Sequence, residues 1–313
     1  MSLSIENDDE LHLSGTPTTA ETADFTDSVD SADSQTATSV QSVVVAPSLS
    51  SYLDGLAVQP LAVLSLRKLI STATVAIRVR RSSDNAEQDI GFDGETLDTA
   101  ALSTFAGSSS AYVTKVYDQK GSFDAVQATS SKQPRIVNAG TYDGKIVFNG
   151  TSNYLSIASL TMGTPYIALF SKLNYGTWGA YRVQFELSSD GVATSGGFAW
   201  YVDNTGTQYV IGGGTGRSNI ASVIADSLAH QITAYANRTE SPPAVQTYLR
   251  LDGAPVATSA GNTSTLTGNF STYPLYIGAR AGTSLFSNFK LESVAIYTAD
   301  TTSIMSEIES IVG

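Results

Sequence analysis

The chain has 313 residues, of which 42% are hydrophobic and 15% charged, so it holds enough apolar side chains for the core of one large domain. Its net charge of −12 is uneven, because ten acidic residues and no Lys or Arg precede Arg67. A nucleic-acid-binding protein would carry a basic stripe instead, which excludes that class.

Three absences bear on the compartment. Cysteine is absent, which favours assembly in a reducing cytoplasm. The first ten residues contain neither the basic region nor the apolar run of a signal peptide, so we expect no secretion signal. No apolar run reaches the roughly 18 residues of a transmembrane helix, so we expect no membrane span.

Residues 1–50 are rich in Ser, Thr, Asp and Ala and poor in large apolar side chains. Such a composition predicts no independent fold, because little apolar surface is available to offset the entropy of ordering. It fits either a flexible acidic tail or a docking arm that orders on a partner, and we favour the arm. The β-prone run Val43–Val45 could add to a sheet edge.

The first elements of the domain are short. Apolar residues between Leu61 and Ser71 have helical spacing and predict a helix. Val75–Arg80 alternates apolar and polar residues and predicts a strand. Asp98–Phe105 predicts a second short helix, with Asp98 as N-cap and Gly107 as C-cap.

From Val113 onward, short apolar runs alternate with turn residues, the pattern of antiparallel strands. Asp252-Gly253 predicts a tight hairpin turn, and Thr301–Val312 predicts an amphipathic helix that packs on the sheets. Without an internal repeat, a two-sheet jelly roll is favoured over a propeller. The predicted strands are Val113–Tyr117, Arg135–Val137, Ile146–Phe148, a run from Tyr154, Tyr166–Ser171, Tyr181–Leu187, Phe198–Val202, Gln208–Ile211, Gln231–Ala236, Thr247–Leu251, Leu275–Ile277 and Lys290–Tyr297.

Six short motifs in the same order carry a family resemblance. They are Arg80–Asp84, Asp89–Phe92, Phe105–Gly107, Tyr117–Gln119, Gln133–Val137 and Phe148–Gly150. As a set they resemble a concanavalin-A-like, LamG-type jelly-roll module. Such modules occur in the catalytic domain of arabinofuranosidase B enzymes, in bacterial surface proteins and in bacteriophage virion proteins. The resemblance spans Leu61 to Tyr297 and implies an all-β sandwich of two antiparallel sheets with a few short helices. We therefore expect a lectin-like domain at 51–313, preceded by an extended acidic arm at 1–50.

Glycoside hydrolysis, which the arabinofuranosidase resemblance implies, needs two carboxyl groups about 5–9.5 Å apart. Glu186, on a predicted strand, is the best catalytic candidate. Asp203 or Asp118 is a possible second carboxyl group. A solvated strand glutamate and two turn aspartates would look the same, so we treat hydrolysis as the alternative function.

Five residues are candidates for ligand binding: Tyr175, Trp178, Trp200, Asp118 and Gln119. Tyr175 and Trp178 lie on a Gly-flanked stretch where a ring would be exposed for stacking. Trp200 lies within a predicted strand, where a core position is favoured over ligand binding. Asp118 and Gln119 could contact a ligand or brace a turn through backbone hydrogen bonds.

We expect no metal and no cofactor. Asp84, Glu87, Asp89 and Asp93 lie close together, but they lack the glycine at the sixth position of an EF-hand loop, so they are only weak calcium candidates. The run Gly212–Gly216 lacks the Lys of a phosphate loop.

The functional expectation is a non-enzymatic bacteriophage virion protein, namely a capsid decoration, head-fibre or tail component. Residues 1–50 would bind other virion proteins, and the lectin-like domain would bind host-surface glycans. We expect a homo-oligomer on the virion surface, assembled in the host cytoplasm, without nucleic acid or membrane contacts. The alternative is a glycoside hydrolase of the arabinofuranosidase type. A bacterial adhesin would need an export route.

Overall fold

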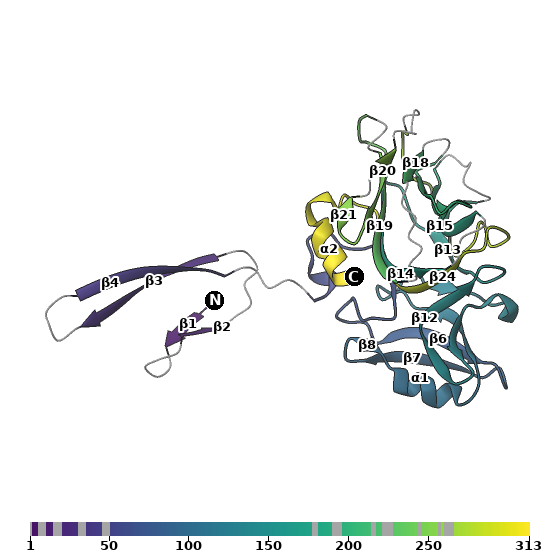
Figure 1. Cartoon of the computed structure of the whole chain (residues 1–313), viewed down its shortest axis with the longest axis horizontal. Coiled ribbons are helices and arrows are strands. Elements are labelled where there is room, and N and C mark those ends of the chain that lie inside the picture. Colours follow the sequence, from purple (N-terminus) through teal and green to yellow (C-terminus); the bar gives the residue numbers. More distant parts are fainter. Residues whose placement is uncertain are drawn as a thin grey trace. The chain divides into compact units, whose positions relative to one another are not determined.

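Among the described residues, the first fifty include four strands that pair with one another. In a computed structural model, the chain is described over residues 2–5, 11–14, 21–30, 36–45, 51–176, 181–189, 196–213, 217–220, 228–242, 246–255, 258–259 and 266–313. It divides into two units, residues 1–50 and 51–313. In the first unit, β1 (Ser2–Ile5) pairs with β2 (Leu11–Ser14), and β3 (Glu21–Asp30) pairs with β4 (Thr36–Val45), both antiparallel (Figure 1). The segment expected to be an extended arm thus contains two hairpins.

The second unit is a sandwich of antiparallel strands, which confirms the predicted fold class. One sheet is centred on β14 and β24, which are hydrogen-bonded to each other along their length. Its order is β21-β20-β19-β14-β24, and β12 and β5 pair with different parts of β24. Its strands are β5 (Ala62–Ser65), β12 (Thr141–Asn149), β14 (Tyr166–Tyr175), β19 (Ala229–Asn237), β20 (Thr247–Leu251), β21 (Ala254–Pro255) and β24 (Asn288–Tyr297).

The other sheet runs in the order β7-β6-β9-β10-β13-β23-β15-β16-β17-β18-β22. β8 (Thr96–Leu97) pairs with β7, and β11 (Arg135–Asn138) bridges β9 and β12. Its strands are β6 (Val75–Arg81), β7 (Glu87–Asp93), β9 (Ala111–Val116), β10 (Ala125–Val126), β13 (Leu155–Leu160), β15 (Arg182–Leu187), β16 (Phe198–Val202), β17 (Gln208–Ile211), β18 (Arg217–Ile220), β22 (Thr258–Ser259) and β23 (Tyr273–Ile277).

Alternate residues of the strands point inward and form the main core, as the period of a strand requires. Large rings fill it in pairs. Phe148 stacks on Phe289 with ring centroids 4.5 Å apart, and Phe185 stacks on Trp200 at 5.5 Å. All four side chains are fully buried, so they contribute much of the apolar area that stabilises the sandwich.

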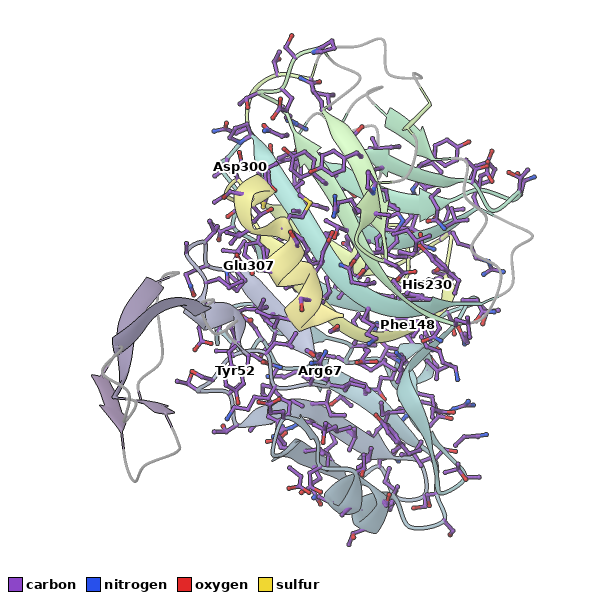
Figure 2. The ribbon with its side chains drawn as sticks, turned by 60° about the vertical axis from the view of Figure 1, so that its left-hand side comes forward. Tyr52, Arg67, Phe148, His230, Asp300 and Glu307 are labelled. Carbon is purple, nitrogen blue, oxygen red and sulfur yellow. The ribbon has the colours of Figure 1, made fainter. Side chains whose placement is uncertain are left out.

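A second apolar cluster lies under the C-terminal helix, α2 (Met305–Val312), which follows the short 3-10 helix η4 (Thr302–Ile304). Ile308 of α2 is fully buried, whereas Glu307 is exposed (Figure 2). The helix contacts β14, β19 and β24, so the predicted amphipathic helix on the sandwich is confirmed.

The local signals around α1 (Thr99–Ala106) are also confirmed. Asp98 accepts a hydrogen bond from the backbone N–H of Ala101 at 2.8 Å, and Gly107 ends the helix at φ 57°. The Asp252-Gly253 hairpin between β20 and β21 forms as expected, with φ of 49° and 77° at the two turn residues.

The predicted helix at Leu61–Ser71 is wrong, because this stretch contains the strand β5. Ala62 and Leu64 face the main core while Val63 faces the cluster under α2. A strand buried on both faces has no polar side, so its apolar run imitates a helical pattern. Two further 3-10 turns, η1 (Leu53–Gly55) and η2 (Ser130–Lys132), flank loops. No helix among the described residues is long and apolar enough to cross a membrane.

Candidate functional site

Glu186 belongs to a row of side chains that crosses the outward face of the second sheet. In an antiparallel ladder, residues directly opposite each other point to the same face. Glu186 of β15 lies opposite Tyr276 of β23 and Ala199 of β16. From Tyr276 the row continues over neighbouring strands through Ser156, Val126, Lys115, Arg78 and Asp89. We call this set the Glu186 row.

The Glu186 carboxylate is fully buried and held by three donors. Its Oε2 accepts from Arg280 Nε at 3.1 Å, and its Oε1 accepts from Ser188 Oγ at 2.8 Å and from the backbone N–H of Ala281 at 3.1 Å. Burial raises the pKa of the neighbouring Tyr276, and the nearby Tyr154 and Glu186 raise it further. The glutamate is therefore an ion-paired group under a cover formed by Arg280 and Ala281.

Asp203, the predicted second carboxyl group, lies just beyond β16 and braces the turn into β17. Its Oδ1 accepts from the Thr205 backbone N–H at 2.8 Å and the Thr207 backbone N–H at 3.0 Å. It stands four residues along the chain from Ala199, the residue opposite Glu186. At about 3.3 Å per strand residue this places it roughly 13 Å further along, beyond the reach of a catalytic pair.

Asp118 and Gln119 both hold backbone groups. Asp118 is nearly buried, and it accepts from the N–H groups of Val63, Lys120, Ser122 and Phe123 at 2.8–3.0 Å. The Gln119 side-chain oxygen accepts from two further backbone N–H groups, and its amide nitrogen donates to two carbonyls. Their polar atoms are thus engaged in fixing the loop to β5 and the segment that follows it.

Two of the three aromatic candidates for ligand binding are buried. Trp200 is fully buried in the main core, and its Nε1 donates to Gln208 Oε1 at 2.9 Å. Tyr175 is also buried, not exposed as its Gly-flanked position predicted, because β14 extends to this residue and its hydroxyl donates to the same oxygen at 2.9 Å. Burial raises its pKa. Trp178 lies outside the described residues.

Two of the weak calcium candidates form ion pairs with arginines. Asp84 pairs with Arg81 at 2.7 Å, and Asp89 pairs with Arg78 at 2.6 Å. The hydrogen bonds of the Arg81 guanidinium lower the pKa of Asp84 to about 2. Glu87 is exposed on β7. Over the described ranges, no three His, Cys, Asp or Glu side chains gather as a metal site would require.

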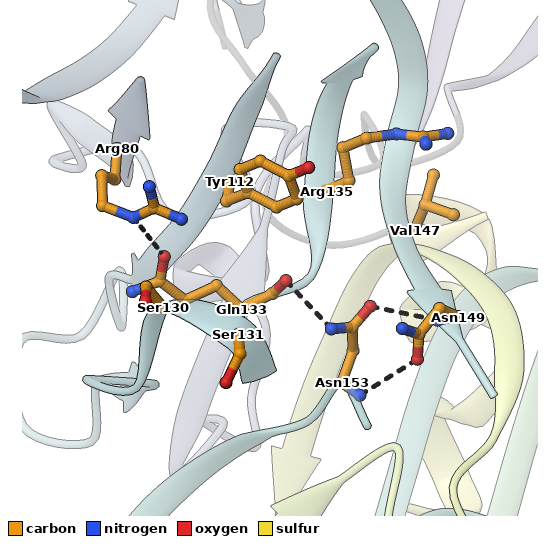
Figure 3. A pocket seen from close by; sticks show the side chains of 9 residues that line it. All are labelled: Arg80, Tyr112, Ser130, Ser131, Gln133, Arg135, Val147, Asn149 and Asn153. Atoms are coloured by element: carbon orange, nitrogen blue, oxygen red, sulfur yellow. Dashed lines mark hydrogen bonds between the residues drawn. The ribbon is translucent and has the colours of Figure 1, made fainter. Parts of the chain in front are cut away.

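A cavity of about 490 Å³ opens on the outward face where β6, β9, β11 and β12 meet η2 (Figure 3). Its lining is polar and carries two arginines and no acidic residue. The lining residues are Arg80, Tyr112, Ser130, Ser131, Gln133, Arg135, Val147, Asn149 and Asn153.

Hydrogen bonds make the wall of this pocket rigid. Gln133 Oε1 accepts from Arg80 Nε at 2.8 Å, and the Gln133 backbone carbonyl accepts from Asn153 Nδ2 at 3.1 Å. Asn149 Oδ1 in turn accepts from the backbone N–H of Asn153 at 3.1 Å. Figure 3 shows these contacts as one connected chain across the pocket. Gln133 and Asn153 are nearly buried, so their side chains are fixed before any ligand arrives.

Sequence reasoning alone missed this pocket as a site. Its signal was present, since Arg80, Gln133, Arg135 and Asn149 all lie in the motifs that carry the family resemblance. Those motifs are far apart in sequence, and only the strand register brings them to one pocket.

No family model matches the chain, and no curated protein matches its sequence. The fold is found in solved structures. A GH54 α-L-arabinofuranosidase soaked with 4-nitrophenyl α-L-arabinofuranoside has a TM-score of 0.55 at 14% identity over 81% of this chain. An arabinofuranosidase complexed with arabinofuranosyl-α-1,2-xylobiose has a TM-score of 0.54 at 15% identity over the same share. The chain spans 62% of the length of each of these proteins. Trypanosoma rangeli sialidase is more distant, with a TM-score of 0.45 at 15% identity over 64% of this chain.

The likeness to the arabinofuranosidases establishes a shared β-sandwich fold. The expectation of a non-enzymatic protein is contradicted, because the arabinofuranosidase structures to which the chain is similar are glycoside hydrolases with a bound substrate or inhibitor. These structures give the virion interpretation no support.

Proposed function

We propose that residues 51–313 form a glycoside hydrolase domain that acts on arabinofuranosides, with Glu186 as its catalytic carboxylate. The observation that carries the proposal is the position of Glu186. It is an ion-paired carboxylate on the outward face of a sandwich whose fold is that of arabinofuranosidases.

The surroundings of Glu186 suit a nucleophile. Arg280 Nε and the Ala281 N–H each hold one of its oxygens, and a carboxylate positioned in this way can attack the anomeric carbon of a sugar. The glycosyl–enzyme bond forms as the bond to the leaving group breaks, and water then hydrolyses that intermediate.

Substrate must first displace the cover over Glu186. The covering segment is built from turns, because Ala281, Gly282 and Leu285 all have positive φ. The Arg280 side chain is already about one third exposed, so it can move away from Glu186 into solvent. Closure of this segment in the absence of substrate would keep water from the carboxylate.

The test uses 4-nitrophenyl α-L-arabinofuranoside, whose nitrophenolate leaves without the help of a general acid. This choice isolates the nucleophile, which matters because Asp203 lies too far away to serve as the partner acid. We expect the full chain to release nitrophenol and Glu186→Gln to lower kcat by about 10³-fold or more.

Glu292→Gln is the matched control, since Glu292 of β24 is another strand glutamate held in an ion pair, with Lys145. It should keep normal turnover. Near-UV circular dichroism checks that Glu186→Gln folds, and Glu186→Asp supplies a second variant that retains the charge but moves it. Lack of turnover by the wild-type chain on arabinofuranosides, or an unaffected kcat in a folded Glu186→Gln variant, would refute the proposal.

For partners and location, we propose that residues 1–50 bind other virion proteins and that the domain binds cell-surface glycans. We also propose that the chain is a homo-oligomer on a virion surface.

A further inference from the structure

A second row of side chains crosses the outward face through the Arg80 pocket. It runs over five strands in the order β6, β9, β11, β12 and β24. Arg80 lies opposite Tyr112, Tyr112 opposite Arg135, Arg135 opposite Val147, and Val147 opposite Lys290. We call these five residues the basic row.

The basic row connects two hollows. The 490 Å³ pocket holds Arg80, Tyr112, Arg135 and Val147. A neighbouring cavity of about 240 Å³ holds Val147 and Lys290. Four steps between strands at about 4.8 Å each separate Arg80 from Lys290 by roughly 19 Å, which is more than one sugar ring covers. The row therefore reaches across two neighbouring cavities that share Val147, over more than the length of one sugar ring.

Two of the three cations in the row lack a carboxylate partner among the described residues. Arg135 is neutralised by a two-pronged ion pair with Asp143, at 2.8 and 3.1 Å. Arg80 instead bonds to two amides, Gln133 Oε1 at 2.8 Å and Asn85 Oδ1 at 2.9 Å. Lys290 is exposed and forms no ion pair with any residue that the structure describes.

This local excess of positive charge contrasts with the net negative charge of residues 51–313. Residues 51–313 contain 20 acidic and 17 basic residues. A guanidinium held by neutral amides keeps its full charge and stays oriented, which prepares it for an anion.

The rest of the row matches a sugar. The Arg80 guanidinium lies over the Tyr112 ring, 5.3 Å from its centroid, so the pocket combines a cation with an aromatic side chain that can pack against a sugar. The hydroxyl groups of Ser130 and Ser131 stand exposed at the rim and can exchange hydrogen bonds with sugar hydroxyls. Val147 provides an apolar floor between the two cations.

We propose that the basic row binds an acidic polysaccharide, with Arg80 and Lys290 each pairing with a uronic acid carboxylate. This binding site is separate from Glu186 and does not depend on glycosidase activity. It would hold a charged chain on the domain whether or not the domain cleaves it.

The experiment measures binding of the full chain to polygalacturonate by affinity electrophoresis and calorimetry. Neutral arabinan and dextran sulfate are run in parallel. Arg80→Gln and Lys290→Gln should each weaken polygalacturonate binding by about tenfold, and the double variant by about 100-fold, because the two sites are far apart. Binding should weaken as salt is raised.

Lys120→Gln is the matched control, because it removes one exposed positive charge from a turn outside the row. It should leave affinity within about twofold, which separates the position of the charge from the total charge. Lys290→Gln alters an exposed side chain, so it reports on binding even if Arg80→Gln disturbs the pocket wall. A thermal melt checks the folding of both.

Three results would overturn the proposal: no binding of polygalacturonate by the wild-type chain at low salt, equal binding of neutral arabinan, or unchanged affinity in Lys290→Gln and a folded Arg80→Gln. Binding of dextran sulfate alone would show that the row recognises sulfate and not carboxylate. Glycosidase turnover is measured separately, so failure of this proposal and failure of the Glu186 proposal are distinguishable.

Discussion

Gly278 lies where no other residue fits. It follows β23 with φ of +88°, and a Cβ placed there would come within 2.6 Å of Cδ1 of the fully buried Phe148 ring. Gly278→Ala should therefore cost about 3 kcal/mol of unfolding free energy, from the left-handed backbone and the overpacked ring together. Chemical denaturation measures the loss.

Gly94, in the turn between β7 and β8, separates the two causes. It has φ of +59°, and a Cβ added there would have no atom within 4 Å. Gly94→Ala should cost only about 1 kcal/mol, the backbone part alone. Equal losses at the two glycines would show that contact with Phe148 contributes nothing.

Asp203 should make stability depend on pH. Burial raises its pKa, but the hydrogen bonds from Thr205, Thr207 and Tyr209 outweigh burial and lower the pKa below its ordinary 3.8. The folded state thus binds this proton less readily than the unfolded state. The stabilisation is complete above about pH 4 and is lost as pH falls through the lower folded value.

The variant Asp203→Asn isolates this effect. At pH 7 its unfolding free energy should be about 1–2 kcal/mol lower than that of the wild type. This difference should become smaller towards pH 2, and urea denaturation at each pH measures it. A gap that stays constant over this range would contradict the assignment.

Besides its apolar contacts, the C-terminal helix α2 is joined to the first sheet by the buried side chain of Glu309. Glu309 Oε1 accepts from Arg250 Nε and Thr233 Oγ1, each at 2.7 Å, and Glu309 Oε2 accepts from Arg250 Nη2 at 3.0 Å. Glu309→Gln should lower the unfolding free energy by about 2 kcal/mol, because it leaves Arg250 without its counter-charge. Glu307→Gln, at an exposed position of the same helix, should change it by less than about 0.5 kcal/mol, and both are measured by thermal or chemical denaturation. Similar losses in both variants would mean that the fastening is not specific to Glu309.

Elements with local signals were predictable from sequence. The cap residues Asp98 and Gly107 and the turn Asp252-Gly253 act within a few residues, and the structure has each as expected. The stretch at Leu61–Ser71 was mispredicted because burial on both faces is set by sheets that form far away in the chain.

The candidate site was harder to predict from the sequence, because its residues are also brought together by strands that lie far apart in the chain. Tyr175 was expected on a loop, yet pairing with β24 continues the strand to this residue and buries its ring. The pocket of Arg80 and Arg135 joins strands more than fifty residues apart, so no local pattern could place them together. Their presence in the resemblance motifs was the only available hint.

At the level of the whole chain, residues 51–313 should fold without the first fifty. Every pairing that the structure describes for the strands from β5 to β24 joins two strands of this unit. Removing residues 1–50 should shift the melting temperature by less than about 2 °C, equivalent to under 1 kcal/mol at this size. A larger loss would show that the first unit stabilises the second.

The truncated chain also tests the proposed docking role of residues 1–50. It should lose association with any particle or partner protein that the full chain binds, while its binding to polygalacturonate stays unchanged. Co-sedimentation of both chains with the same partner preparation measures this. Retained association would place the contact elsewhere.

The enclosure of Trp200 gives the molecule its own optical probe. One of the chain's two indole rings is sealed between Phe185 and the Gln208 amide, out of reach of solvent. We therefore expect the emission of Trp200 to be blue-shifted and shielded from acrylamide quenching for as long as the two sheets stay together. A red shift will mark their separation without any dye or label.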